Sequence, residues 1–270
     1  MKIRHDYHIH TSLSGHSAAN LFVKNIIKAA IDQELENIVI LEHVPTVGPY
    51  RKSIINKEVI DYPRDEINVI ATEIEKYKHE FPGKIWLGAE IDADPNCRDG
   101  RLLLNNLEGI EVILGSTHYL PLLSQMWFEI DELSPENNAT IYQEWLSWIK
   151  NIAKNPAVNV LAHPGTEVVA IGAMDWFDRD VIADFAEVLQ VCREHNTAIE
   201  FNVLVARKIS SIQLLGYIDM VATAIDMGVK ISLGSDSHTL PQIGDFTWID
   251  EITEKIGLRE EHFYHPENLS

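Results

Sequence analysis

The sequence predicts an α/β fold in which seven strands form one barrel-like domain. Short apolar segments alternate along the chain with amphipathic helical segments, the pattern of βαβ units around a parallel sheet. The chain has 270 residues, and an α/β barrel of this length is routinely one domain, here 1–270. Two alternatives remain open on the pattern alone: a barrel with an eighth strand, and an open doubly wound sheet.

The predicted strands are short runs of apolar, often β-branched residues. Most end in a histidine or a carboxylate rather than in an ordinary turn. In chain order they are Ile3–His10, Ile38–Leu41, Ile85–Glu90, Val112–Ser116, Val158–Ala162, Ala198–Asn202 and Val229–Gly234.

The predicted helices follow these strands and carry apolar residues near helical spacing, as Leu21, Ile27 and Ile31 do in the first. The second is highly charged and stops at Pro82-Gly83, a strong helix breaker. In chain order the helices are Asn20–Gln33, Arg64–Glu80, Ala139–Lys154, Arg179–His195, Ser211–Met227 and Ile243–Ile256, with a tail, Gly257–Ser270, packed outside.

Three connections are longer than a compact domain needs: Val44–Pro63, Tyr119–Asn138 and Thr166–Phe177. Connections of this length are usually lids or binding loops, so we expect them to carry selectivity for a ligand.

The composition restricts the class of protein. Two cysteines, Cys97 and Cys192, are too few for a disulfide framework, and neither a membrane-length apolar run nor a signal-peptide pattern is present. We therefore expect a cytoplasmic protein without a membrane partner. The formal net charge of −19 disfavours a nucleic-acid-binding face, because phosphate contacts need clustered cations. It permits a site rich in metal-binding carboxylates.

Metal-capable side chains close the predicted strands. In a parallel barrel these carboxyl ends share one face, where active sites lie. The first strand alone offers two histidines at positions i and i+2, which point to the same side. The candidates are His8, His10, His16, His43, Glu90, His118, His163, Asp236 and His238, with Glu42, Asp92, Glu200 and Asn202 beside them.

A single histidine at a strand end is more often a hydrogen-bonded structural residue, and Glu90 or Asp236 alone would read as a helix cap. Seven of the twelve histidines lie at such strand ends, and a separate structural role for each does not explain that number. One catalytic zinc needs three protein ligands, so nine candidates indicate two or three divalent ions. Ions this close together commonly serve phosphoester hydrolysis. Zinc fits best, with iron or manganese as alternatives.

These motifs resemble those of the PHP (polymerase and histidinol phosphatase) superfamily. The resemblance rests on His8-x-His10, Glu42-His43, Glu90, His118, His163 and Asp236-x-His238. It implies a distorted (β/α)7, TIM-like barrel and a trinuclear centre. By resemblance, His8, His10, Glu90 and Asp236 hold one ion. Glu90 bridges to a second ion held with His118 and His163, and a third is held by His16, His43 and His238.

Two groups within the superfamily share particular segments with this chain. The segments around His163 and Asp236 resemble small bacterial trinuclear-zinc phosphatases, whereas Gly115–Tyr119 and Glu200–Asn202 are closer to histidinol-phosphate phosphatases. The latter resemblance makes Arg207 the candidate for binding the substrate phosphate. Arg207 and Lys208 read equally well as a solvated pair. The apolar run Val203-Leu204-Val205 departs from the polar segment found in those enzymes.

The sequence therefore predicts a metal-dependent phosphomonoesterase for a small phosphorylated metabolite, with histidinol phosphate as one candidate. A metal-bridging hydroxide would attack phosphorus, and Asp236 or His238 would assist proton transfer. The alternatives are another metal-assisted hydrolase, of nucleotide diesters, carboxylic esters or amides, and a non-catalytic regulatory PHP protein. Oligomeric state and any role for Glu42, Glu200 and Lys208 stay open.

Overall fold

The computed structural model describes residues 2–14, 16–44, 65–94, 99–102, 108–120, 125–126, 135–175, 179–247 and 249–268. Cys97 and all but the first residue of the predicted loop Val44–Pro63 lie outside these ranges. The other two predicted loops, Tyr119–Asn138 and Thr166–Phe177, fall within them only in part.

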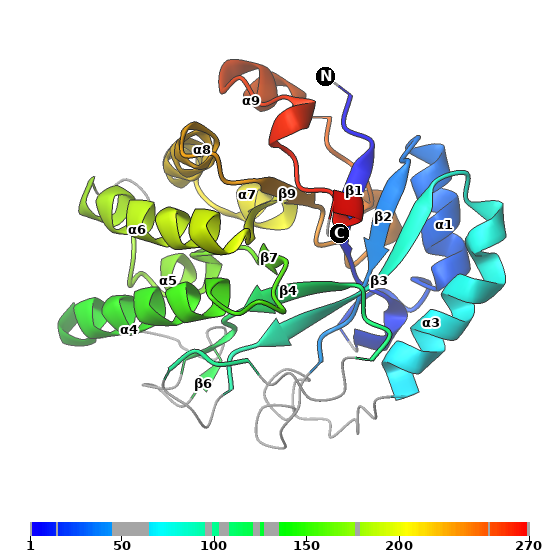
Figure 1. Cartoon of the computed structure of the whole chain (residues 1–270), viewed down its shortest axis with the longest axis horizontal. Helices are drawn as coiled ribbons and strands as arrows, with labels where there is room; N and C mark the ends of the chain where they lie inside the picture. Colours follow the sequence, from blue (N-terminus) through cyan, green and yellow to red (C-terminus); the bar gives the residue numbers. More distant parts are fainter. Residues whose placement is uncertain are drawn as a thin grey trace.

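Seven parallel strands form the centre of the molecule, as the alternating pattern predicts (Figure 1). Their spatial order follows the chain, β1-β2-β3-β4-β7-β8-β9, so each strand pairs with its sequence neighbour. Their bounds are β1 His5–Ile9, β2 Asn37–Ile40, β3 Lys84–Asp92, β4 Val112–Ser116, β7 Val160–Leu161, β8 Ala198–Asn202 and β9 Ile231–Gly234. A separate antiparallel pair consists of β5 (Tyr119–Leu120) and β6 (Gln125–Met126).

The sheet closes on itself at the carboxyl ends of its first and last strands. Ile9 and Ser237 form a parallel bridge, in which the Ser237 N–H donates to the His8 carbonyl (3.3 Å) and the His10 N–H to the Ser237 carbonyl (3.2 Å). The fold is thus a nearly closed seven-stranded, TIM-like barrel. The open doubly wound sheet and the eighth strand considered above are both wrong for the described chain.

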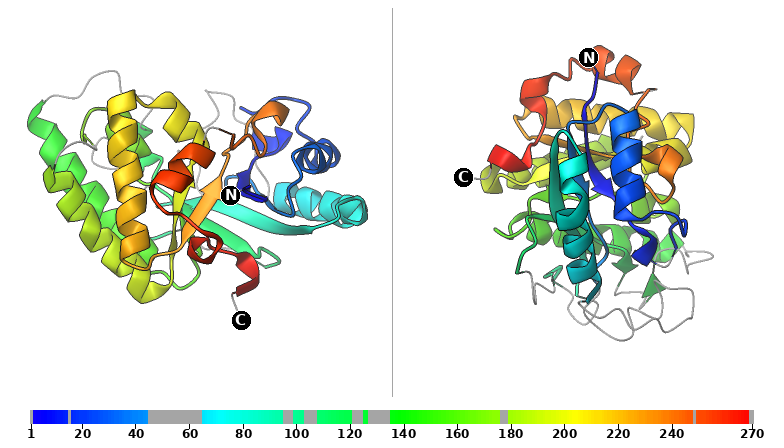
Figure 2. Two further views of the ribbon diagram at one scale, coloured as in Figure 1. Left: turned by 90° about the horizontal axis from the view of Figure 1, so that it is seen from above. Right: turned by 90° about the vertical axis from the view of Figure 1, so that its right-hand side faces the viewer.

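Helices cover the outside of the barrel, with α4, α6 and α8 on one side and α1 and α3 on the other (Figures 1 and 2). The helix bounds are α1 Val23–Asp32, α3 Asp65–Tyr77, α4 Pro135–Ala153, α5 Thr166–Ala170, α6 Arg179–His195, α7 Val203–Lys208, α8 Ser211–Asp226 and α9 Asp250–Lys255. Single 3-10 turns lie at η1 Ser12–Ser14, η2 Lys78–Glu80, η4 Leu240–Gln242, η5 Glu260–His262 and η6 Pro266–Asn268.

Two predicted elements differ from the structure for backbone reasons. The predicted loop Thr166–Phe177 begins with helix α5, because Gly165 has φ +93° and turns the chain directly into a helix. The predicted last helix, Ile243–Ile256, is reduced to α9. Gly244 has φ +64°, a left-handed conformation that interrupts a helix. The apolar residues beside it are therefore buried in a turn rather than in a helix.

The core has two layers. The outer layer lies between strands and helices and includes Ile9 of β1 and Ile26 of α1. The inner layer fills the barrel below its carboxyl ends with Tyr7, Val39, Leu41, Val112, Leu114, Val160, Ala162, Ala198 and Tyr264. A packed interior of this kind is stiff, so it gives the side chains at the strand ends a rigid base.

The C-terminal tail contributes to this inner layer. Its Tyr264 packs with the barrel interior, and the Tyr264 N–H donates to the Ile231 carbonyl of β9 (2.9 Å). The predicted tail, Gly257–Ser270, therefore does not simply pack outside: one of its residues closes the amino-terminal end of the barrel. None of the helices in the described ranges combines the length and apolar character that crossing a bilayer requires.

Candidate metal centre

The nine predicted ligand residues meet at the carboxyl end of the barrel. The register of β1 against β2 shifts between Asp6 and Ile9, so Tyr7 faces the barrel interior and His8, one residue later, faces the cluster. Ile9 packs outward in the outer core, and His8 and His10 lie together with their Nε2 atoms 3.1 Å apart. The i, i+2 spacing thus places both imidazoles on one side, as predicted.

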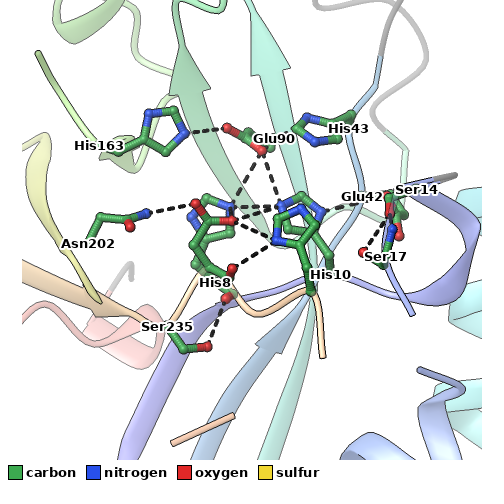
Figure 3. Close-up of polar contacts among 12 residues, drawn as sticks. His8, His10, Ser14, Ser17, Glu42, His43, Glu90, His163, Asn202 and Ser235 are labelled. Carbon is green, nitrogen blue, oxygen red and sulfur yellow. Dashed lines mark hydrogen bonds and ion pairs between the residues drawn. The ribbon is translucent and has the colours of Figure 1, made fainter. Parts of the chain in front are cut away.

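Glu90 lies at the middle of the cluster, between His163 and His43 in Figure 3. Its Oε1 atom is 2.8 Å from His163 Nε2 and 3.5 Å from His118 Nε2. Its Oε2 atom faces the other way and is 3.0 Å from His43 Nδ1. The two oxygens of one buried carboxylate therefore face different histidines, the arrangement that a bridging ligand requires.

A second carboxylate, Asp236, lies across from Glu90. Asp236 Oδ1 is 3.4 Å from His10 Nε2 and 3.7 Å from His8 Nε2, and Glu90 Oε2 is 3.4 Å from each of the same two nitrogens. Four ligand atoms thus converge on one point. This is the set that the family resemblance implies for one ion.

His16 and His238 form the outer part of the cluster, with Nε2 atoms 2.7 Å apart. The His43 ring lies 5.3 Å from that of His16, and His10, His43 and His238 each offer a ligand atom within 4.8 Å of the others. The set His16, His43 and His238, implied for a third ion, is therefore brought together. His10 adjoins it and links it to the Asp236 side.

Most of these imidazoles are fixed through Nδ1, which leaves Nε2 for the centre of the cluster. The anchors are carboxylates or backbone carbonyls, as is usual for metal-binding histidines. The Nδ1 hydrogen bonds are His8 to Glu200 Oε1 (2.8 Å), His118 to Asp92 Oδ2 (2.8 Å), His16 to Ser14 O (3.0 Å) and His238 to Asp236 O (2.9 Å). The Nδ1 atoms of His163 and His10 lie 3.3 Å from Glu167 Oε1 and 3.6 Å from Glu42 Oε2, without a hydrogen bond. His43 is the exception and presents Nδ1 to Glu90.

This anchoring tests whether the donor set fits a cation. A neutral imidazole has one N–H, and a carbonyl can only accept. His16 and His238 must therefore donate from Nδ1 to the Ser14 and Asp236 carbonyls, so their Nε2 lone pairs face each other at 2.7 Å. Two lone pairs at that separation repel each other unless a cation lies between them. The residues present thus fit a metal site.

The charges of the cluster are strongly coupled. Burial opposes a charge on His8, but the carboxylates of Glu200, Asp236 and Glu90 outweigh it and raise the pKa of His8 to about 10. For His238, burial and nearby His10 lower the pKa to about 3. The pKa of Asp236 lies well below its usual value because facing imidazoles, His8 first, outweigh its burial. A cation at His8 Nε2 would therefore compete with a proton for that nitrogen.

The backbone is strained at two of the proposed ligands. His163 has φ 21° and Asp236 has φ 51°, the left-handed region that non-glycine residues seldom adopt. Such strain costs on the order of 1–3 kcal/mol per residue and gathers at functional sites. The backbone is thus less stable at these two residues, and this conformation orients their side chains toward the cluster.

Several buried acids complete the site. Glu42 accepts from the N–H and hydroxyl of Thr11 (2.8 and 2.7 Å), and Glu200 accepts from the His163 N–H (2.7 Å). Both therefore take part as supports, a role that the sequence leaves open. Glu167 is a residue of the site that the sequence does not predict. Its position four residues after His163 is a signal only once α5 is known to be helical.

Arg207, the candidate for binding phosphate, lies on α7 and is bonded to Asp245. Its Nη2 atom is 2.7 Å from Asp245 Oδ2 and 2.8 Å from the Asp245 carbonyl. Its neighbour Lys208 lines the cavity in front of the metal-capable cluster, and Arg207 is not among the described residues that do. The apolar segment Val203-Leu204-Val205, which differs from the polar segment of histidinol-phosphate phosphatases, forms the first turn of α7.

A cavity of about 710 Å³ opens onto the cluster. Its floor consists of His16, His43, Glu90, His118, His163, Asp236 and His238. One wall is apolar and comes from α5, α7 and the residue that follows α7, with Val169, Ala170, Leu204, Val205 and Ile209. Thr166, Lys208, Ser210 and Gln213 are its polar wall residues. The volume suits a small molecule that reaches the metal-capable floor.

Comparison with known proteins gives two kinds of match. The family model described as the PHP domain matches residues 6–203. A probable phosphatase of Caldanaerobacter subterraneus is 25% identical over 260 residues, covering 95% of this chain and 84% of that protein. A probable phosphatase of Clostridium novyi is 26% identical over 275 residues, covering 97% and 89%.

Among solved structures, a histidinol phosphate phosphatase of Lactococcus lactis has the same fold. That structure is a complex with zinc, L-histidinol and phosphate. Its TM-score is 0.68 at 18% identity, covering 95% of this chain and 94% of that one. An identity this low supports the likeness of the folds and no more.

Proposed function

This chain belongs to the PHP-domain family, and on that basis we propose that it is a metal-dependent phosphomonoesterase for a small phosphorylated metabolite. The observation that carries the proposal is the position of Glu90, whose two oxygens face two different groups of histidines. Its support comes from the imidazoles around it, most of which are fixed through Nδ1 with Nε2 turned inward. The relatives named as probable phosphatases agree with this activity.

We assign three ions to the centre. The first set is His8, His10, Glu90 and Asp236; the second is Glu90, His118 and His163; the third is His16, His43 and His238. Imidazole and carboxylate ligands suit zinc, with iron and manganese as alternatives. Ions so placed would supply an activated water and positive charge for the phosphoryl oxygens.

The remaining chemistry belongs to protein side chains. His238 and Asp236 lie at the cavity floor, with His238 Nδ1 3.5 Å from Asp236 Oδ1. We assign proton transfer with the leaving oxygen to one of them, at a stage when it is not bound to an ion. Two cations of α7 are candidates for the substrate phosphate. Lys208 already lines the cavity, whereas Arg207 would have to release Asp245 first.

The wall of the cavity restricts the organic part of the substrate. Five apolar side chains form it, four from α5 and α7 and Ile209 just after α7. The acids among the described lining residues of the cavity are Glu90 and Asp236, which we assign to the ions. Histidinol carries an ammonium group, which would be recognised best by a free carboxylate. We therefore propose that monoesters of apolar alcohols are better substrates than histidinol phosphate.

The test begins with metal content and a substrate panel. The purified chain, reconstituted with zinc, iron or manganese in turn, should bind more than one ion and hydrolyse phosphomonoesters. Glu90→Ala should abolish turnover. Fewer than two ions per chain would overturn the multinuclear centre. Hydrolysis of carboxylic esters or diesters with no turnover of monoesters would favour another metal-assisted hydrolysis.

Substrate selectivity is tested on the apolar wall. We expect kcat/KM for phenyl or alkyl phosphates to exceed that for histidinol phosphate at least tenfold. Leu204→Asn should lower it for the apolar esters about tenfold, since lost apolar contact in a pocket is worth roughly 10–200-fold. The control is Leu215→Asn, an exposed leucine of α8 away from the cavity. Equal kcat/KM for all monoesters would overturn the selectivity and leave the activity standing.

The phosphate contact is tested with Lys208→Gln and Arg207→Gln. Lys208→Gln should raise KM about tenfold or more, because it removes the cation that already faces the cavity. A larger effect from Arg207→Gln would show instead that this arginine moves to the phosphate.

A further inference from the structure

A second group of metal-capable side chains lies at the opposite end of the barrel. His5 begins β1, and Glu260 and His265 belong to the C-terminal tail. One ligand atom from each of the three lies within 4.8 Å of the others. The catalytic proposal uses none of these residues, and the packed barrel interior, with Tyr7 and Tyr264, separates them from Glu90.

His5 supplies the observation that points to a ligand. Its side chain is 2% exposed, stacked on the Tyr7 ring (4.8 Å between centroids) with the edge of Phe263 against it (4.6 Å). Its Nε2 atom is buried and has no hydrogen-bond partner in the described chain. Buried polar atoms nearly always have a partner, so an unpaired one indicates an unseen ion or molecule.

His265 is already held in the orientation of a metal-binding histidine. Its Nδ1 atom lies 2.8 Å from the Tyr7 hydroxyl, and its Nε2 atom lies 3.2 Å from Glu260 Oε1. If Nδ1 donates to the hydroxyl oxygen, the Nε2 lone pair faces the carboxylate oxygen. A cation between them satisfies both, and the hydroxyl then fixes the ring as anchors usually do.

We propose that His5, Glu260 and His265 bind a divalent ion of the zinc type, separate from the catalytic centre. Two imidazoles and one carboxylate are ligands that zinc prefers, and they leave a fourth position for water. The Glu260 side chain is 67% exposed, so an ion can enter from solvent. The alternative to an ion is a proton on His265, in which case His265 and Glu260 form a simple ion pair.

The proposed ion has a structural role. It joins the first residue of β1 to a tail whose Tyr264 closes the amino-terminal end of the barrel. The tail is also attached by the hydrogen bond from the Tyr264 N–H to the Ile231 carbonyl, by that from the Lys230 ammonium to the Glu261 carbonyl, and by the ion pair of Lys84 with Glu267. An ion at this place would hold the tail on the barrel without touching the cavity.

The first measurement counts tightly bound zinc in the full chain. Glu260→Gln and His265→Gln should each bind one equivalent fewer than the unmodified chain, at the same free zinc concentration, and keep their phosphatase activity within about twofold. Glu261→Gln is the matched control, because Glu261 is a neighbouring exposed acid outside the cluster. Glu260 is itself exposed, so its variant should fold normally. An equal zinc count in all four proteins would overturn the proposal.

The second measurement detects the tail directly. Arg259 is exposed and precedes Glu260, so trypsin can cleave there and release the tail. Added zinc should slow this cleavage at least fivefold in the unmodified chain and leave the rate unchanged in Glu260→Gln. Equal zinc protection of both would contradict the site. Absence of all phosphatase activity would concern the catalytic proposal and not this one, because neither readout depends on turnover.

Discussion

At the scale of single residues, the centre depends on which ring nitrogen each histidine presents. Glu200 decides this for His8 by binding its Nδ1, and it also accepts the His163 N–H. Glu200→Gln places an amide where both partners need an acceptor. We expect metal affinity or kcat/KM to fall about 10–100-fold, as for other residues that orient metal ligands.

The control for that variant is Glu194→Gln, because Glu194 is an exposed glutamate of α6 that accepts a hydrogen bond from Gln190 and supports no residue of the cluster. Its metal content and activity should match those of the unmodified chain. Unchanged kinetics in Glu200→Gln would show that the contact of Glu200 with His8 Nδ1 does not affect activity.

Gly234 makes the packing behind His8 possible. A Cβ at this position would lie 2.3 Å from Glu200 Oε1 and 2.5 Å from His8 Cβ, closer than real contacts allow. Gly234→Ala should therefore displace both residues, lower the free energy of unfolding by about 1–3 kcal/mol and reduce metal content. Chemical denaturation and metal analysis measure the two effects.

Gly115→Ala is the comparison for overpacking alone. Its Cβ would lie 2.4 Å from Ile152 Cγ2, in the outer core rather than behind a ligand. A similar loss of stability with normal metal content is expected. Equal metal loss in both variants would mean that the effect at Gly234 is merely a general weakening of the fold.

Most of the proposed ligands could be picked out from the sequence, because they follow the ends of predicted strands and the carboxyl ends of a parallel barrel share one face. Their supports could not. Asp92 follows Glu90 in the chain, yet its partner His118 arrives from the next strand, and only the register between β3 and β4 brings the two together. Glu167 depends on the turn through His163 and Gly165 into α5, and a helix of five residues gives no periodic pattern that would reveal it.

At the scale of elements, the short helix α7 connects the sheet to the cavity wall. Asn202 caps it by accepting from the Val205 N–H (2.9 Å), and the same amide donates to Glu200 and Asp236 (3.2 Å each). Asn202→Ser keeps an acceptor for the cap and removes the amide donor. We expect nearly unchanged stability and about tenfold lower activity.

Asn202→Ala removes both functions and should in addition cost about 1 kcal/mol of stability, the usual cost of losing a cap. Thermal unfolding and kcat measured on both variants separate the roles. Full activity in Asn202→Ser would show that the two carboxylates need no support from α7.

Helix α7 is one of two short helices that the sequence does not predict. The sequence predicts the long helices and all seven strands of the barrel within a few residues, because their apolar patterns are sustained. Helices α5 and α7 have five and six residues, too short for a periodic signal, and α7 follows directly on β8. Their placement comes from tertiary contacts at the cavity.

At the scale of the whole molecule, bound ions and global stability are coupled. The chain carries a net charge of −19, and the centre gathers buried carboxylates that repel each other. Ions that bind only the folded chain stabilise it by about 2.7 kcal/mol at 100 times their dissociation constant. For a chain of this size, removing them should lower Tm by about 5–10 °C.

Calorimetry with and without a chelator measures this shift, and adding zinc back should reverse it. The shift should shrink strongly in Glu90→Ala, which has lost the central carboxylate. A Tm unaffected by chelation in the unmodified chain would contradict ion binding at both proposed places.

The seam of the barrel has a consequence for how the protein is made. Its two edges, β1 and β9, are the first and last strands of the barrel in chain order, and each brings proposed ligands for the same centre. During synthesis β1 keeps an unpaired edge, and His8 and His10 meet Asp236 only after β9 has emerged from the ribosome. The proposed centre can therefore be completed only after β9 is made, and a chain truncated before β9 should be prone to aggregation and unable to complete it.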